Sequence, residues 1–238
     1  MIKVTVWNEF FHERTDENVK AVYPDGLHKV IADFLGKEED ITVRTVTLLD
    51  ENCGITDELL ADTDILIWWG HMRHDDVPDE IAVKVQKAVL SGMGMIFLHS
   101  AHHSKPFKLL MGTTCNLSWR EDGDWERLFV IDKTHPITQG IGNYIKLEHE
   151  ETYAEPFAIP EPEKLLFIGS YEGGDVFRSG CCYRRENGNI FYFQPGHEAF
   201  PTFYNKDIQT VIKNAVRWAA PIAPRVELVC PHIEKLSD

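Results

Sequence analysis

Histidines gather at the end of one apolar stretch of the chain. Residues 95–98 are apolar, and they are followed by His99, Ser100, an alanine, His102 and His103. A short apolar run of this kind is typical of a strand buried on both faces of a sheet. In open α/β sheets, sites form just beyond the carboxyl ends of the strands. We therefore expect a functional site at this turn, rather than a strand end that only carries solvated imidazoles.

Two further histidine groups follow other predicted strands. Residues 64–69 read as a buried strand, and the polar loop after it contains His71 and His74. The segment Pro195-Gly196-His197-Glu198 comes directly after a predicted strand over residues 190–194. Because consecutive strands of such a sheet are usually neighbours, the His71 loop should lie beside the His99 turn. The sequence thus predicts histidine clusters that face one crevice.

Clustered imidazoles with nearby carboxylates suit either a divalent metal or acid–base chemistry. A catalytic zinc site needs about three protein ligands and one open position. We expect a divalent metal, with zinc as the first candidate, and with His71, His74 and His99 as its ligands. Glu9 is a further ligand candidate. The alternative is catalysis by the side chains themselves. The candidate catalytic residues are His99, Ser100, His103, His197 and Glu151.

Composition narrows the class of protein. The chain has 238 residues and a formal net charge of −14, so a nucleic-acid or anionic-membrane partner is not expected. Its five cysteines lack paired CxxC spacing, which gives neither a disulfide framework nor a zinc ribbon. No Gly-x-Gly-x-x-Gly follows the first strand, so NAD is not expected. Without a signal peptide or a membrane-length apolar run, we expect a cytoplasmic protein.

The order of elements predicts the fold class. Strands are predicted over residues 2–7, 41–48, 64–69 and 95–98, with helices over 27–35 and 79–90 between them. This alternation is the signature of a mostly parallel sheet between two helical layers, a three-layer α/β/α fold. Later strands are predicted over residues 127–132, 165–171, 181–185 and 190–194, the last two joined by a hairpin. A final helix over residues 208–219 ends before Pro221.

We expect one domain over residues 1–220 and a C-terminal tail over 221–238. The tail is rich in proline and has no helical or strand periodicity. It is expected to lie against a neighbouring subunit or the domain surface, and we expect a homo-oligomer.

Several motifs together resemble the ThuA-like trehalose-utilisation family, a branch of the class I glutamine amidotransferase-like fold. The resemblance covers nearly the whole chain. Its sharpest pieces are Trp68-Trp69-Gly70-His71, Gly92-Met93-Gly94, Leu98-His99-Ser100, Leu110-Met111-Gly112-Thr113, Val176-Phe177-Arg178-Ser179-Gly180 and residues 191–198. The resemblance implies an amidotransferase-like, flavodoxin-like α/β domain and a role in disaccharide metabolism.

The chain departs from true amidotransferases at the nucleophile. Their cysteine sits on a strained Gly-x-Cys-x-Gly turn between strand and helix. Here either His99 or Ser100 occupies the tip of the turn, and Cys115 reads as a small buried residue. Their later His-Pro-Glu signature resembles residues 194–198, where Glu198 directly follows His197. Without a thiolate at the turn, glutaminase activity is not expected.

A small-molecule sugar as substrate would need aromatic faces and hydrogen-bonding side chains. Trp69, Trp119 and Tyr153 are candidates for the aromatic faces, and Arg73 and Arg178 for the hydroxyl groups. Any of these aromatic residues would fit a hydrophobic core equally well.

Three functions are therefore open. The first is an enzyme acting on trehalose-type disaccharides or their keto derivatives, by metal-assisted or His/Glu acid–base chemistry. The second is a non-catalytic sugar-binding or accessory module on a relict amidotransferase fold. The third, a hydrolase that uses Ser100 with His197 and Glu198, fits the turn poorly. The sequence leaves the substrate and the number of subunits open.

Overall fold

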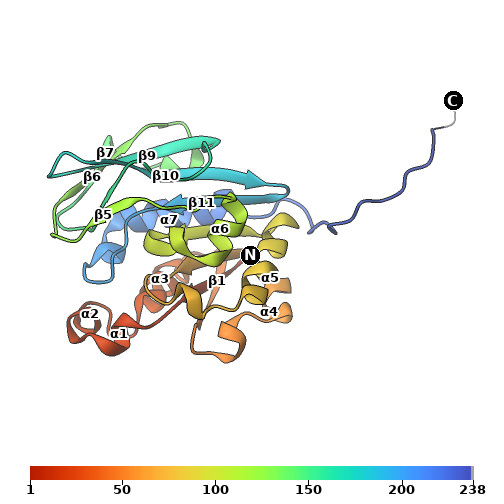
Figure 1. Ribbon diagram of the computed structural model, residues 1–238, viewed down its shortest axis with the longest axis horizontal. Helices are drawn as coiled ribbons and strands as arrows, with labels where there is room; N and C mark the ends of the chain where they lie inside the picture. The colour runs from red at the N-terminus through yellow and green to blue at the C-terminus, as the bar shows by residue number, and fades with distance from the viewer. Residues whose placement is uncertain (237–238) are drawn as a thin grey trace.

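A computed structural model describes residues 1–236 of the chain. Strands and helices alternate in the first half, and a run of strands precedes the last helix (Figure 1). The strands are β1 (Ile2–Asn8), β2 (Ile41–Thr47), β3 (Ile65–Trp69), β4 (Gly94–Leu98), β5 (Ser118–Arg120), β6 (Glu126–Val130), β7 (Tyr144–Leu147), β8 (Thr152–Ala154), β9 (Lys164–Tyr171), β10 (Val176–Arg185) and β11 (Gly188–Phe193). The α-helices are α1 (His12–Thr15), α2 (Glu17–Val22), α3 (Leu27–Leu35), α4 (Asp57–Ala61), α5 (Asp79–Leu90), α6 (Lys105–Met111) and α7 (Lys206–Ala219). Short 3-10 helices include His74–Asp76, His99–His103 and Thr202–Tyr204.

One sheet organises the described part of the chain. Its strand order is β2-β1-β3-β4-β11-β10-β9-β6-β7. The strands from β2 to β11 pair in parallel, and those from β11 to β7 pair antiparallel. The α/β fold class is confirmed, and the sheet is mixed because the predicted 186–189 hairpin starts an antiparallel half. Strands β6, β9, β10 and β11 of that half and the β10–β11 hairpin were predicted from the sequence, whereas β7 and the other pairings were not.

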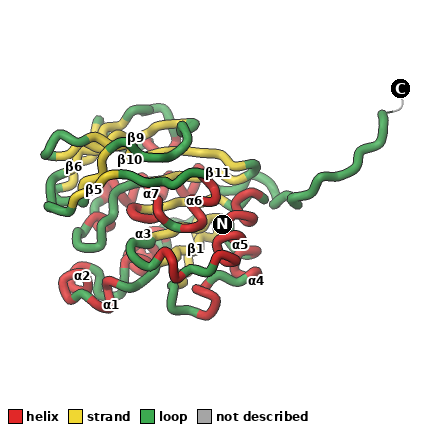
Figure 2. Tube along the Cα trace, in the orientation of Figure 1, coloured by secondary structure: helices red, strands yellow, loops and turns green. Residues whose placement is uncertain are grey.

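Helices cover the parallel half on both faces, as expected (Figures 1 and 2). On one face α3 and α7 pack against alternate residues of the strands, including Val4, Ile67 and Leu98. On the other face α5 and α6 pack against the intervening residues, including Leu66, Trp68 and Phe97. Successive side chains of a strand point to opposite faces. Because the residues at both sets of positions are apolar, this half of the sheet is buried on both faces.

The sheet order brings three loops to one edge. The last residues of β3 and β11, Trp69 and Phe193, each pair with Leu98 at the end of β4. Because these strands are parallel, the chain leaves all three at the same carboxyl edge. The prediction that the loop after β3 lies beside the His99 turn is confirmed.

Helix α6 was not predicted, although its boundaries carry clear local signals. The Ser104 side chain caps the helix by accepting a hydrogen bond from the Phe107 amide, and Pro106 lies in the first turn. Gly112 ends the helix in the left-handed conformation. Its seven residues are too few to show a helical period, so only these capping residues reveal it.

Two parts of the chain lie outside the main sheet. Strands β5 and β8 form a separate two-stranded antiparallel sheet. Residues 221–236 form neither helix nor strand and extend away from the domain (Figure 1). Within the described residues, no helix has the length and apolar character needed to cross a bilayer.

Candidate active site

His99 occupies the tip of the turn after β4. Its φ angle is 54°, in the left-handed region that residues with a Cβ rarely adopt, and its side chain is fully buried. The Tyr192 hydroxyl donates to the His99 carbonyl (3.1 Å) and holds this backbone. The ring Nδ1 lies 2.9 Å from the Gln194 carbonyl oxygen. A carbonyl oxygen only accepts, so Nδ1 carries a proton and Nε2 is the nitrogen left for the site.

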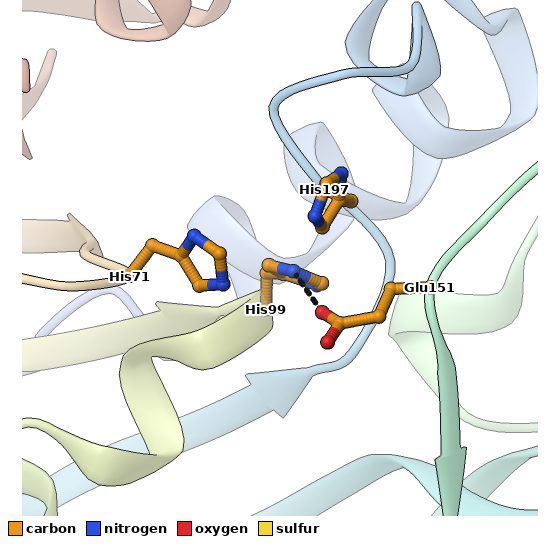
Figure 3. A group of neighbouring side chains, drawn as sticks. All are labelled: His71, His99, Glu151 and His197. Carbon is orange, nitrogen blue, oxygen red and sulfur yellow. Dashed lines mark ion pairs between the residues drawn. The ribbon is translucent and has the colours of Figure 1, made fainter. Parts of the chain in front are cut away.

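Four side chains converge beyond the strand ends. His71, His99, Glu151 and His197 each place one nitrogen or carboxylate oxygen within 4.8 Å of the others (Figure 3). His71 and His99 come from the loops after β3 and β4, His197 follows β11, and Glu151 directly precedes β8. Three of the four side chains are buried and His71 is partly exposed.

The contacts within this group are close but poorly aligned for hydrogen bonding. His99 Nε2 lies 3.0 Å from Glu151 Oε2, yet both atoms are buried without an aligned hydrogen-bond partner. His197 Nε2 is likewise buried without one. Buried polar atoms are normally paired, so a set of unpaired donors and acceptors that face one point is a candidate ligand site.

The His99–Glu151 pair is electrostatically coupled. Burial disfavours the charged imidazolium, but the Glu151 carboxylate outweighs it and raises the pKa of His99 to about 9. Burial likewise opposes ionisation of Glu151, and the facing His99 lowers the pKa of that carboxyl below its ordinary value. The pocket is therefore built to keep Glu151 ionised.

Backbone and carboxylate contacts orient His71. The Glu9 carboxylate accepts backbone N–H groups from His71 (2.6 Å), Met72 (3.0 Å) and Arg73 (3.0 Å), which fixes the loop after β3. His71 Nδ1 lies 2.9 Å from Glu198 Oε1, and its other ring nitrogen points toward His99 (Figure 3). Carboxylates behind an imidazole commonly fix its orientation in metal sites.

His12 joins the same carboxylate from the other side. Its Nδ1 lies 3.1 Å from Glu198 Oε1, so His12, His71 and Glu198 form a second group of potential ligands. Burial opposes the charge on Glu198, but the imidazoles, His71 first, hold its pKa below the ordinary value. His12 is not among the site candidates named from the sequence, although its place soon after β1 puts it at the same sheet edge.

His197 is held differently from the other two imidazoles. The buried Glu150 carboxylate accepts the backbone N–H groups of Gly196 and His197 (both 3.0 Å) and the Thr202 hydroxyl (2.8 Å). The Ala199 amide donates to His197 Nδ1 (3.2 Å). Burial lowers the pKa of His197 to about 4, so the ring is neutral at pH 7. With Nδ1 accepting, the neutral ring carries its proton on Nε2, the atom that faces the group of four.

A cleft of about 480 Å³ opens beside these groups. His71, Ser100, Glu151 and Tyr153 line it near the donor atoms. More exposed residues line its mouth, among them Met72, His103, Asn116, Trp119 and Glu121. Its volume lies within the range of about 300–1,000 Å³ found for small-molecule sites.

Comparison with known proteins agrees with this architecture. The family model described as trehalose utilisation, ThuA, matches residues 3–219. The chain belongs to the ThuA family. A search among curated protein sequences gives no match.

Solved structures show the same fold as this ThuA-family chain at low sequence identity. A ThuA-like protein from Parabacteroides merdae is 16% identical, with a TM-score of 0.69, over 96% of this chain and 92% of that one. A second, from Bacteroides uniformis, is 16% identical with a TM-score of 0.64, over 92% and 91% of the two chains. A glutamine amidotransferase from Thermotoga maritima is 8% identical with a TM-score of 0.57, over 92% and 97%.

The turn after β4 in this ThuA-family chain carries an imidazole at its tip. His99, and not Ser100, has the positive φ, which decides between the two positions left open by the sequence. Ser100 Oγ is hydrogen-bonded to the Tyr153 hydroxyl (2.7 Å), and within the described part of the chain no hydrogen bond links it to His197. This arrangement does not form the serine–histidine pair that the third function requires.

Other predicted site residues lie apart from the group of four. His74 and His103 lie beside each other, with ring centroids 5.8 Å apart, and both line the cleft. His74 is therefore near the site but outside the two potential ligand groups found among the described residues. Burial lowers the pKa of His74 to about 3, so its ring is neutral.

Three further candidates have mainly structural contacts. Trp69 is a core residue and not a cleft residue: its ring is fully buried, and Nε1 donates to the Gly196 carbonyl (2.9 Å), which supports the His197 loop. Arg73 pairs with Asp76 outside the cleft. The Arg178 side chain donates from Nε to the Glu155 carboxylate oxygen Oε1 (2.7 Å).

Cys115 directly precedes Asn116, which lines the cleft. It is buried, and burial raises the pKa of its thiol. Its carbonyl oxygen lies 2.8 Å from His102 Nδ1. These contacts are those of a packed residue.

Proposed function

We propose that the chain is a metal-assisted enzyme of trehalose utilisation, acting on trehalose-type disaccharides or their keto derivatives. The observation that carries the proposal is the convergence of His71, His99, Glu151 and His197 on one point beside the cleft. The ThuA family supports the substrate class. Two Salmonella typhimurium proteins of the same fold are described as cytoplasmic, which supports that location for this chain as well.

The tautomers divide the four groups into ligands and a proton carrier. His99 holds its proton on Nδ1, and the Glu198 carboxylate beside His71 Nδ1 favours the same tautomer there. Because the pKa of His99 is raised to about 9, its Nε2 would have to lose a proton before both rings could direct an Nε2 lone pair inward, with the Glu151 carboxylate completing three ligands. His197 presents Nε2–H instead, because its Nδ1 accepts from Ala199. It is suited to donate a hydrogen bond to a substrate oxygen at the open position.

A divalent cation bound there would polarise a sugar oxygen as a Lewis acid, which is a route that needs no cysteine nucleophile. The remaining residues bind and orient the substrate. Ser100 and Tyr153 offer hydroxyls on one wall of the cleft, and His197 holds a proton near the reacting end. The rival proposal, acid–base chemistry by His99, Glu151 and His197 without metal, uses the same residues.

Elemental analysis of untagged protein, before and after chelation, tests the metal. A tight site is expected to hold close to one equivalent of zinc or another divalent metal per chain, whereas less than roughly a tenth of an equivalent would leave only the acid–base proposal. Trehalose and its keto derivatives are then incubated with loaded and stripped protein, and their consumption is followed by chromatography. Consumption that needs the metal supports the proposal, and binding without consumption supports an accessory sugar-binding role.

Single substitutions test the ligand set. Glu151→Gln keeps the shape of the side chain but removes its charge, and His71→Ala removes one imidazole. Each is expected to lower the metal affinity by at least tenfold, measured against a competing chelator. His103→Ala is the matched control, because His103 lines the cleft outside the ligand group. Equal metal affinity in all three variants would exclude this ligand set.

A further inference from the structure

The exposed indole of Trp119 lies at the mouth of the cleft. Trp119 is 64% exposed, whereas Trp7, Trp68 and Trp69 are buried in the core. A large aromatic face left in solvent beside a cleft is typical of a binding surface, because a ligand that covers it removes apolar surface from water. Apolar faces of sugar rings are suitable partners for such a surface.

The small β5–β8 sheet connects this indole to the candidate metal centre. Trp119 is paired directly with Tyr153, and paired residues of antiparallel strands place their side chains on the same face. The Tyr153 ring stacks on His99, with centroids 5.2 Å apart and planes 17° apart, and its hydroxyl bonds Ser100. An aromatic wall therefore runs from the metal end of the cleft to its mouth.

The backbone that presents this wall is held in place. Arg120, next to Trp119, forms ion pairs with Asp122, Asp124 and Asp175. A strand anchored in this way keeps its exposed neighbour in one position, and a fixed position lowers the entropy lost on binding.

Asn116, three residues before Trp119, lies on a similarly held segment at the mouth of the cleft. Its carbonyl oxygen accepts the Ala158 amide (2.8 Å), and the adjacent Cys115 amide donates to the Ala158 carbonyl (3.1 Å). The Asn116 side chain itself is exposed and lines the cleft. An amide can both donate to and accept from hydroxyl groups.

The charges of the residues that line the cleft indicate which kind of sugar can bind there. Lys and Arg are absent from the described residues that line the cleft, whereas Glu121 and Glu151 place carboxylates at its mouth and at its metal end. Phosphate groups are normally recognised by Arg, Lys or helix N-termini. A phosphate on the outer ring would find no Lys or Arg among the described residues that line the cleft.

We propose that the cleft binds an unphosphorylated two-ring saccharide, with one ring at the His71–His99–Glu151 centre and the second ring stacked on Trp119 and bonded by Asn116. This assignment rests on the proposed function and adds where each ring lies. It makes Trp119 and Asn116 determinants of specificity for a disaccharide over a single sugar.

Calorimetry on the full, zinc-loaded chain tests the assignment with trehalose, methyl α-glucoside and trehalose 6-phosphate. Trehalose is expected to bind at least about tenfold more tightly than either of the other two sugars. Methyl α-glucoside lacks the second-ring contact, and trehalose 6-phosphate adds an unpaired charge. Trp119→Ala should weaken trehalose binding by about tenfold and change methyl α-glucoside binding by less than about threefold. Trp125→Phe is the control for the loss of an indole outside the cleft.

Acrylamide quenching gives a second readout. Trehalose should protect part of the tryptophan fluorescence in the wild type and in Trp125→Phe, and this protection should disappear in Trp119→Phe. Trehalose binding that is unchanged in Trp119→Ala, or trehalose 6-phosphate binding as tight as that of trehalose, would overturn the assignment but leave the metal proposal intact. If no saccharide binds to the zinc-loaded wild type, the proposed function fails as well.

Discussion

At the scale of single residues, the candidate centre depends on groups that orient its imidazoles. Gln194 fixes the ring of His99, Ala199 fixes that of His197, and Glu198 lies behind His71. Such outer groups select the tautomer and therefore decide which ring nitrogen can bind a metal. Removing the Glu198 carboxylate, the one side chain among these groups, should weaken metal binding without removing any of the three proposed ligands.

Glu198→Gln tests this role. The amide keeps the size of the side chain but removes the charge beside His71 and His12. We expect metal affinity to fall by about 10–100-fold, the usual effect of losing such a partner. Competition with a chromogenic chelator measures it, and Glu148→Gln, at an exposed carboxylate, is the control. An affinity equal to that of the wild type would show that Glu198 does not orient His71.

A second residue-scale prediction concerns the buried Glu126. Burial, with the nearby Glu150 adding to it, raises the pKa of Glu126 well above its ordinary value, so the folded protein keeps this carboxyl neutral. The unfolded chain ionises this carboxyl above its ordinary pKa, which lowers the free energy of the unfolded state as the pH rises. The stability present at low pH is thus lost between the ordinary pKa and the folded pKa.

Glu126→Gln imitates the neutral carboxyl at every pH. Its free energy of unfolding should rise relative to the wild type as the pH goes from 5 to 8, by at most about 1.4 kcal/mol per pH unit. Urea unfolding at several pH values measures the difference. A difference that stays constant over this range would mean that Glu126 is ionised in the folded protein.

At the scale of elements, β4 carries His99 and is packed without space for a larger residue at its start. A Cβ on Gly94 would lie 2.3 Å from the Ala219 carbonyl oxygen of α7 and 2.4 Å from Ile65 Cδ1 of β3. Gly94 thus allows β4 to lie against the end of α7. The same contact fixes the position of the strand and therefore of His99, which directly follows it.

Gly94→Ala should therefore destabilise the protein by about 1–3 kcal/mol, as overpacking usually does. Gly142→Ala is the matched control, because nothing lies within 4 Å of a Cβ there, and it should change stability by less than about 0.5 kcal/mol. Urea unfolding compares the two variants. Similar free energies of unfolding in the two variants would show that α7 moves to make room for the Cβ at no cost in stability.

At the scale of the whole molecule, the tail adds little to the domain. Residues 221–236 lie outside the sheet and its helices, and their contacts include a hydrogen bond from the Val226 amide to Ser91 (2.9 Å). Several apolar side chains of the tail are exposed, among them Ile222, Ile233 and Leu236. Exposed apolar segments of this kind favour association with another surface.

A chain ending at Ala220 should fold and keep the metal affinity of the full chain. The homo-oligomer expected from the sequence stays a prediction, and the same variant tests it. If the tail joins subunits, light scattering should show a lower mass for the shortened chain than expected from the missing residues alone. Loss of folding in the shortened chain would instead make the tail part of the domain.

The sequence alone determined the strands of the parallel half of the sheet and the positions of the site loops. Alternating strands and helices, apolar runs and capping residues are local patterns, so they predicted the parallel half of the sheet and placed His71, His99 and His197 after strand ends. They also placed Glu151 among the catalytic candidates, although the side chains that it meets could not be predicted from its position in the chain.

The tertiary structure decided which of these residues meet. His74 lies only three positions after His71 but points to His103, whereas Glu151, distant in sequence, lies 3.0 Å from His99. Trp69 and Trp119 are the same residue type, yet Trp69 is buried in the core and Trp119 is exposed at the cleft. Side-chain direction and long-range pairing depend on how the sheet is assembled, because contacts between distant segments leave no periodic pattern in the chain.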